Sequence, residues 1–497
     1  MRIKSKPGDF RVFELLRAGY LADRGRFRVY RVTKRKLTSL EAAGELALAA
    51  GVKPSDVAMA GLKDRQGVTT QFMSVRGGRP VRFMTPSLKV ETAGFAPQAL
   101  TSRDSTGNGF EIVLRGVAAS ERAEIERELP DVRDNGVPNY YGDQRFGNLR
   151  HGQGWVAKEL ALGRHEDALW NLLAAPSEND NPRNRAFKRA LASAWGEWKR
   201  CREVAGAFGQ HHSIFEHLAR DAEDFAGAFR YVKTEVRLIH LYAFQSHIWN
   251  RAVARFVGET AARGAKIVVP ALEGPLSFAR GPLPTPAEWK GTFRVPGEGL
   301  LDVEHADQRA WLTAALAAEG LAPEQFRIAG VPGFALKGED RQLVIRPRGL
   351  EVVPDRRAQG VLRVRFDLPR GAYATLVLAR LAPSRAAEEP EDSARRRAAG
   401  AASSGAPERA GTGGAAREEA PGQGRAGQRE SRRGARGAAR GGARRVPAVA
   451  DPVAETPAAP PAPDERPAAR PRAGAAARGG RPAGGRRGAP PERRRGR

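Results

Sequence analysis

The stretch from Ser384 to Arg497 contains no phenylalanine, tryptophan, tyrosine, methionine or lysine, and alanine, glycine, proline and arginine dominate it. A segment without aromatic residues and with few aliphatic ones cannot bury enough apolar surface to offset the entropy lost on ordering. We therefore expect residues 384–497 to be a disordered tail. The folded part is then residues 1–383, which is long enough for two domains with substantial cores.

Charge is the second constraint. The whole chain has a formal net charge of +27; the tail has 25 arginines against 13 acidic residues, which leaves +15 on the folded part. Because both parts are basic, the excess does not come from the tail alone. We expect a polyanionic partner, and nucleic acid is favoured over a membrane surface. A generally basic proteome is the alternative explanation.

Cysteine content and apolar runs exclude several classes of protein. Cys201 is the only cysteine, so neither an internal disulfide nor a cysteine-based metal cluster is possible, as is typical of a reducing cytoplasm. No run approaches the ~18 apolar residues of a membrane helix, and the first residues do not resemble a signal peptide. No phosphate-binding or dinucleotide-binding glycine motif is present. We expect a soluble cytoplasmic protein with no metal and no cofactor.

The hydrophobic period changes twice along the folded part. Residues 1–149 alternate strand-like runs with one clear helix, "TSLEAAGELALAAG", which Thr38 and Glu41 cap at its start and Gly51 ends. Strands are predicted in "DVAMAG", "TTQFMSVRG" and "NGFEIVLRGV". Helical spacing then dominates from about His151 to Phe256, in "GWVAKELALG", "HEDALWNLLAA", "NRAFKRALASAWGEWKRCREVA" and "HLYAFQSHIWNRAVARFV".

The end of the folded part returns to strands. After a predicted helix in "ADQRAWLTAALAAEG", strands follow in "QLVIRPRGLEVV" and "VLRVRFDLP", and "YATLVLARLA" is helical in pattern. This order predicts an α+β fold, with a mixed or antiparallel sheet interrupted by an inserted, mostly helical domain. We expect the sheet domain in residues 1–155 and 339–383, the insertion in residues 156–338 and the tail in residues 384–497.

"AGLKDRQGVTTQ" places Asp64 between Lys63 and Arg65, on a loop between two predicted strands. Neighbouring cations lower the pKa of a carboxyl group and keep it ionised at neutral pH. A nucleophilic or basic aspartate needs this when its substrate carries phosphates. The alternative is a solvated turn with local ion pairs, and the triplet alone favours that alternative.

Further motifs accompany the triplet. "AGLKDRQGVTTQ" resembles the G-x-K-D-x-x-x-x-T-x-Q signature of the TruD family of tRNA pseudouridine synthases. "KSKPGDFRVFE", "VPNYYGDQRFG", "YAFQSHIWN" and "RFDLPRGAYATLVLARL" are similar to four other segments of that family, in the same order. The resemblance covers about three quarters of the chain. It departs at Gly8, Tyr141 and Ala372, where the family usually has Glu, Phe and Ser.

The resemblance implies a pseudouridine synthase-like catalytic domain and a role for six residues. Asp64 is the catalytic aspartate, Lys4 and Lys63 are supporting cations, and the substrate-binding residues are Phe10, Asn139 and Tyr373. The implied reaction isomerises a uridine of tRNA to pseudouridine, at position 13 in the bacterial family, after the base leaves its stack. Attack at C1′ and proton removal from C2′ both stay open for Asp64.

A second function on the same scaffold stays open: a non-catalytic RNA-binding or RNA-remodelling protein. The intact Lys63–Asp64 pair and Asn139 favour the isomerase, because a pure binder does not need a carboxylate facing phosphate. The tail runs "ARGAARGGARR" and "AARGGRPAGGRRG" resemble RGG-like segments, which predicts contacts with other structured RNA. A passive solubilising extension is equally consistent with this composition.

Overall fold

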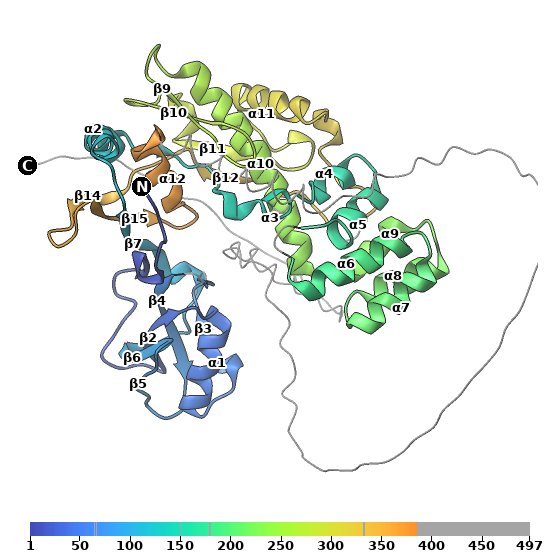
Figure 1. Cartoon of the computed structure of the whole chain (residues 1–497), viewed down its shortest axis with the longest axis horizontal. Coiled ribbons are helices and arrows are strands. Elements are labelled where there is room, and N and C mark those ends of the chain that lie inside the picture. The colour runs from blue at the N-terminus through green and yellow to red at the C-terminus, as the bar shows by residue number, and fades with distance from the viewer. Residues whose placement is uncertain (64, 66, 151, 178–179, 332, 385–497) are drawn as a thin grey trace, which may run out of the picture. The chain divides into compact units, whose positions relative to one another are not determined.

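The computed structural model describes residues 1–63, 65, 67–150, 152–177, 180–331 and 333–384 (Figure 1). Two sequence predictions therefore lie outside the described residues: the position of Asp64, and all of the predicted tail after Ser384. The described part mixes helices and strands, which confirms the predicted α+β class. None of its helices is long and apolar enough to cross a membrane.

A nine-stranded sheet is the frame of the first and last parts of the chain. Its order is β14-β15-β7-β1-β4-β2-β6-β5, and β3 pairs with β4. Every pairing is antiparallel except that of β1 with β4, so the predicted mixed sheet is confirmed. The strands are β1 Phe10–Leu16, β2 Phe27–Arg35, β3 Val57–Met59, β4 Val68–Arg76, β5 Phe83–Met84, β6 Leu88–Ala96, β7 Ser105–Arg115, β14 Arg348–Pro354 and β15 Val361–Pro369.

Helix α1, Ser39–Ala50, forms as predicted. The Thr38 hydroxyl accepts a hydrogen bond from the Glu41 amide at 3.1 Å, and the Glu41 carboxylate accepts one from the Thr38 amide at 2.7 Å. Gly51 ends the helix with a φ of 73°, a conformation that glycine adopts at little cost. The apolar face of α1 packs under the sheet in a cluster with Tyr30 and Val32.

Two predictions about helices were wrong. The first 149 residues contain a second long helix, α2, Ala119–Asn135, besides α1. Its sequence is mostly charged, carries Pro130 inside and buries only Ile125, Glu128 and Val132, so the hydrophobic pattern is weak. The stretch "NRAFKRALASAWGEWKRCREVA" is also not one helix. It breaks where Gly196 takes a φ of 91°.

The middle of the chain is mostly helical, with short strand pairs. Helix α10, Thr234–Thr260, is its longest element and buries more than half of its residues. The other α-helices after α2 in the described residues are α3 Gly147–Arg150, α4 Val156–Ala161, α5 His165–Leu173, α6 Pro182–Ala194, α7 Trp198–Phe208, α8 His212–Arg220, α9 Phe225–Ala228 and α11 Ala306–Ala318, with α12 Ala374–Leu381 after the last strand of the sheet. The short strands are β8 Val137–Pro138, β9 Lys266–Val269, β10 Leu276–Ala279, β11 Thr292–Val295, β12 Glu339–Gln342 and β13 Val344–Ile345.

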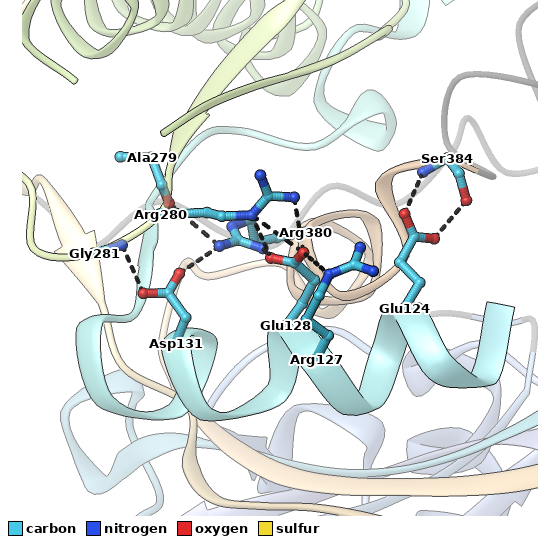
Figure 2. A network of polar contacts seen from close by, with 9 residues as sticks. All are labelled: Glu124, Arg127, Glu128, Asp131, Ala279, Arg280, Gly281, Arg380 and Ser384. Carbon is cyan, nitrogen blue, oxygen red and sulfur yellow. Dashed lines mark hydrogen bonds and ion pairs between the residues drawn. The ribbon is translucent and has the colours of Figure 1, made fainter. Parts of the chain in front are cut away.

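A buried ion network fixes α12 against α2 (Figure 2). Arg380 of α12 donates to the carboxylate of Glu128 at 2.7 Å and to that of Asp131, both on α2. Arg280, just after β10, donates to Glu128 at 2.8 Å. Arg380 and Glu128 are fully buried. Three segments that are distant in sequence are therefore joined by charge-assisted hydrogen bonds. The network anchors α12, which lies close to the C-terminal end of the described chain.

Replacing Glu128 by glutamine will destabilise the fold by about 3 kcal/mol, because breaking a buried pair leaves uncompensated arginines. Burial alone would raise the pKa of Glu128, but hydrogen bonds from Arg280 and Arg380 together outweigh it and lower that pKa to about 2, from an ordinary 4.5. A lowered carboxyl pKa gives stability that is present above pH 4.5 and lost as the pH falls through 2. Urea midpoints at pH 7 and pH 3 measure both effects.

The matched control is Glu126→Gln on the same helix. Glu126 pairs with Arg122 at 2.7 Å, but both side chains are at least half exposed. An exposed pair of this kind contributes about 0–1 kcal/mol. Equal midpoints for the two variants would contradict the role given to the buried network.

Candidate active site

An ion pair at the start of β1 positions Phe10. The Asp9 carboxylate accepts hydrogen bonds from Arg115 Nη2 at 2.7 Å, from Arg115 Nε at 2.9 Å and from the Lys6 amide at 2.8 Å. The hydrogen bonds from Arg115 lower the pKa of Asp9, so it stays ionised although it is buried. This pair closes the "KPGDF" turn. A Cβ on Gly8 would meet no atom within 4 Å. The backbone therefore leaves room for a side chain at the position where the similar family usually has glutamate.

Phe10 itself is 8% exposed and meets the edge of Phe110, with ring centroids 6.2 Å apart. Lys4 lies over its ring, with Nζ 4.3 Å from the centroid. One face of the predicted stacking residue is therefore covered by a cation. Lys4, predicted as a supporting cation, lies beside the predicted base-stacking residue.

The loop that carries Asp64 ends against Phe10. Gly67 has a φ of 105°, and a Cβ at this position would lie 2.8 Å from the Phe10 carbonyl oxygen. Only glycine allows this approach without a shift of the backbone. Arg11 and Val68 are register partners in the parallel pair β1 and β4. The structure therefore brings the loop and the predicted stacking residue together, although Asp64 itself lies outside the described residues.

Lys63, the other predicted supporting cation, directs its ammonium group to Glu14. The two groups are 2.9 Å apart, and the Glu14 side chain is fully buried. Lys63 Nζ also donates to the Asn108 side chain at 2.9 Å, and its amide donates to Ser39 Oγ at 2.8 Å. Ser39 in turn donates to Gln71 at 2.7 Å. These contacts fix the residue before Asp64 on three strands and one helix.

Lys34 is a buried lysine that sequence analysis missed. It is 1% exposed, and its Nζ donates to the carbonyl oxygens of Leu37 at 2.8 Å and Lys63 at 2.9 Å. The Lys63 carbonyl belongs to the peptide bond that leads into Asp64. The signal was present in the alternation of β2, where Lys34 shares the inward face with Tyr30 and Val32.

Asn139 is held by both groups of its amide. Its Oδ1 accepts a hydrogen bond from Arg341 Nη2 at 3.0 Å, and its Nδ2 donates to the Gln342 carbonyl oxygen at 3.1 Å. Arginine only donates and a carbonyl only accepts, so these partners fix which way the amide points. Each amide group has capacity for one more hydrogen bond, as recognition of a uracil edge requires.

The turn after Asn139 is supported from helix α10. Asn250 accepts a hydrogen bond from the Tyr141 amide and donates to the Tyr141 carbonyl, both at 2.9 Å. It also donates to Glu273 at 2.6 Å, and burial raises the pKa of that carboxyl group well above its ordinary value. The Tyr140 hydroxyl donates to the Ser277 carbonyl at 2.6 Å, and its ring is fully buried. These residues hold the backbone of the turn.

Tyr373 packs on the same turn. It precedes α12, and its ring lies 6.4 Å from that of Tyr141, edge to face. A Cβ on Gly142 would lie 2.8 Å from Tyr373 Cδ1, so the ring rests on the backbone of the glycine. Arg341 Nη2 donates to the Gly371 carbonyl at 2.9 Å, two residues before Tyr373. The structure therefore brings Asn139 and Tyr373 together.

Replacing Gly142 by alanine will displace the Tyr373 ring and lower turnover by about 10-fold, since catalytic geometry tolerates little misplacement. The comparison variant is Gly147→Ala, because no atom lies within 4 Å of a Cβ there. Initial rates and thermal midpoints of both proteins are measured. Equal rates would show that Tyr373 has no positional role.

Strand pairing connects the two groups of residues. Asn108 on β7, which binds Lys63, is the register partner of Glu14 on β1 and of Leu368 on β15. Tyr373 follows Leu368 by five positions. Phe10 begins β1, the Asp64 loop leads into β4 beside it, and the segment leading to Tyr373 leaves β15, which is separated from β1 by β7 alone. Among the residues that the structure describes, no His, Cys, Asp and Glu side chains group to hold a metal ion.

Known proteins are similar to this chain in sequence and in fold. A family model described as tRNA pseudouridine synthase D (TruD) matches residues 1–267 and 292–381. A tRNA pseudouridine synthase D of Aquifex aeolicus is 28% identical over 390 residues, 77% of this chain and 98% of its own. A probable tRNA pseudouridine synthase D of Methanopyrus kandleri is 32% identical over 333 residues, 66% of this chain and 78% of its own.

A solved structure supports the fold. The crystal structure of a putative tRNA pseudouridine synthase D from Methanosarcina mazei superimposes with a TM-score of 0.58 at 21% identity, over 77% of this chain and 93% of that one. The fold and the matched sequences together define an isomerase of the pseudouridine synthase class. The family model spans most of the chain, and the chain belongs to the TruD family of tRNA pseudouridine synthases.

Proposed function

We propose that this chain converts uridine 13 of tRNA to pseudouridine and that Asp64 is the catalytic aspartate. The observation that carries the proposal is the anchoring of the Asp64 loop. Lys34 and Ser39 hold the backbone of Lys63 on one side, and Gly67 rests on Phe10 on the other. A loop fixed at both ends on a rigid sheet is suited to present a reactive group.

The reaction exchanges one bond of the nucleoside for another. The bond between N1 and C1′ breaks, the uracil turns, and C5 bonds to C1′; the C5 proton leaves and N1 gains one. Nothing is oxidised and no group is added. An ionised Asp64 supports this either by attack at C1′ or by removal of a proton from C2′. A buried cation next to the loop favours the ionised form, and Lys34 supplies one.

The pocket residues have complementary parts in binding the base. A uridine inside an RNA helix first leaves its stack, at a cost of a few kcal/mol. Stacking on aromatic side chains such as Phe10 and Tyr373 returns about 1–3 kcal/mol per contact. The Asn139 amide, fixed in direction by Arg341 and Gln342, offers a donor and an acceptor to the uracil edge.

Mapping of pseudouridine in tRNA tests the assignment of position 13. Total tRNA from cells with the gene will carry pseudouridine at position 13 of a subset of tRNAs, and tRNA from cells without it will carry uridine there. Re-expression of the wild-type chain restores the modification. An unchanged position 13, with a loss at another nucleotide, would keep the activity and overturn the site.

Three further parts of the proposal rest on sequence. We propose that the catalytic domain comprises residues 1–155 and 339–383 and the insertion residues 156–338. The strands of the large sheet come from residues 10–115 and 348–369, which supports this division. Binding of other structured RNA by the arginine-rich tail stays a prediction from composition, as does a cytoplasmic location.

A further inference from the structure

Two arginines lie against one tyrosine ring beside Asn139. The Cζ atom of Arg341 is 3.8 Å from the centroid of the Tyr141 ring, and that of Arg145 is 5.3 Å from it. Arg145 also lies 5.3 Å from the ring of Tyr242. Tyr141 is 5% exposed, so the ring that both arginines contact is held in the protein interior. Stacking on an aromatic ring holds a guanidinium group without consuming its hydrogen-bond donors.

Neither arginine forms an ion pair among the described residues. Other arginines of the described chain do, such as Arg294 with Asp302 at 2.9 Å and Arg380 with Glu128 at 2.7 Å. Glu339 acts on Arg341 only at longer range. Two positive charges thus lie against one ring, and no carboxylate of the described residues is in contact with either of them.

Both guanidinium groups also keep unused donors. Arg341 bonds through Nε to the Asn139 carbonyl at 2.8 Å, and through Nη2 to Asn139 Oδ1 and the Gly371 carbonyl. Within the described part of the chain, Arg145 bonds through Nε alone, to Ser246 Oγ at 3.0 Å. Arg341 Nη1 and both terminal nitrogens of Arg145 have no hydrogen-bond partner among the described residues. A guanidinium group has five N–H donors, so several remain for a ligand.

The electrostatics point to an anion as that ligand. Burial lowers the pKa of Arg341, and the nearby charge of Arg145 lowers it further. Arginine nevertheless remains protonated at neutral pH. A partly desolvated cation beside a second cation is costly unless an anion neutralises it, and planar guanidinium groups match the oxygens of a phosphate.

We propose that Arg145 and Arg341 bind a backbone phosphate of the RNA, next to the uridine that enters the pocket. The inference rests on the proposed function, because it takes RNA as the substrate. Arg341 also orients the Asn139 amide, so one guanidinium group joins the phosphate site to the site that recognises the base. Binding of this phosphate sets the distance between the nucleotide backbone and Asn139.

The first test is the salt dependence of RNA binding. Arg145→Gln removes one charge, and glutamine still reaches Ser246. A lost phosphate contact lowers the slope of log K against log salt concentration by about 0.7–0.9. The control is Arg24→Gln, which removes an exposed arginine from the loop between β1 and β2. Full-length proteins and unmodified tRNA transcript are used, and thermal midpoints exclude misfolding.

The second test neutralises the phosphates instead of the protein. Methylphosphonate replaces, one at a time, the linkages on either side of the modified uridine. Arg145→Gln is expected to weaken binding of natural RNA about 10-fold and to have no further effect at one neutral linkage. An unchanged salt slope, or the same loss with every neutral linkage, would overturn the phosphate site.

The two proposals fail in different ways. If the wild-type chain forms pseudouridine but Arg145→Gln leaves the salt slope unchanged, the phosphate site is wrong and the proposed function stands. If the slope falls and the effect disappears at one neutral linkage while no pseudouridine forms, the phosphate site stands and the proposed function is wrong.

Discussion

Asp64→Asn will abolish pseudouridine formation while folding and RNA binding persist. Asparagine has the size of aspartate but carries no charge, so it can neither attack C1′ nor take a proton from C2′. Loss of a positioned acid or base lowers a rate by about 10²–10⁴-fold, and loss of a nucleophile lowers it at least as much. The measurement is single-turnover formation of pseudouridine at saturating protein, with binding followed separately.

Asp23→Asn is the matched control for this variant. Asp23 is an exposed residue of the loop between β1 and β2, so its replacement makes the same change of charge away from the proposed site. Wild-type turnover is expected for the control. Substantial pseudouridine from Asp64→Asn under the same conditions would remove Asp64 from the mechanism.

Lys34→Met will lower turnover by about 10²–10³-fold at neutral pH and shift its pH dependence. The ammonium group of Lys34 is buried and donates to the carbonyl of the residue before Asp64. A nearby cation lowers the pKa of a carboxyl group, so its removal raises that pKa. An aspartate that acts in its ionised form then loses activity at neutral pH and regains part of it as the pH rises.

The pH profile separates this effect from a purely structural one. Lys36→Met serves as the control, because Lys36 is exposed and lies two residues from Lys34. This substitution removes the same positive charge, so it has the same effect on the net charge that attracts RNA. The acid limb of the rate profile is expected at higher pH for Lys34→Met and unchanged for Lys36→Met. A uniform loss with no shift of the limb would assign Lys34 to support of the loop alone.

Local signals predicted the elements that carry them. Helix α1 has a capping box at Thr38 and a left-handed glycine at its end, and both signals can be recognised from a few consecutive residues. Helix α2 has Ala118 in place of a serine or threonine cap and interrupts a weak apolar stripe with Pro130, so its local signals are weak and its packing against α12 supports its conformation. The break at Gly196 likewise depends on a backbone conformation that the helical period does not reveal.

Residues of the candidate site could be predicted only where they lie in a motif. Phe10, Asn139 and Tyr373 lie in segments that resemble a family, and their contacts were not visible in the sequence. Arg341 bonds to Asn139 across a separation of 202 residues, which no local pattern encodes. Lys34 lies 29 residues from Lys63, and only the inward face of β2 hinted at its burial.

Release of tritium from tRNA labelled as [5-³H]uridine tests the central claim most directly. Pseudouridine formation replaces the C5–H bond by a bond to C1′, so each isomerised uridine gives up the label at C5. The purified wild-type chain, without added cofactor, is predicted to release one equivalent per substrate tRNA and then stop. Asp64→Asn is predicted to release none. Complete retention of the label by tRNA that the wild-type chain binds would contradict the account.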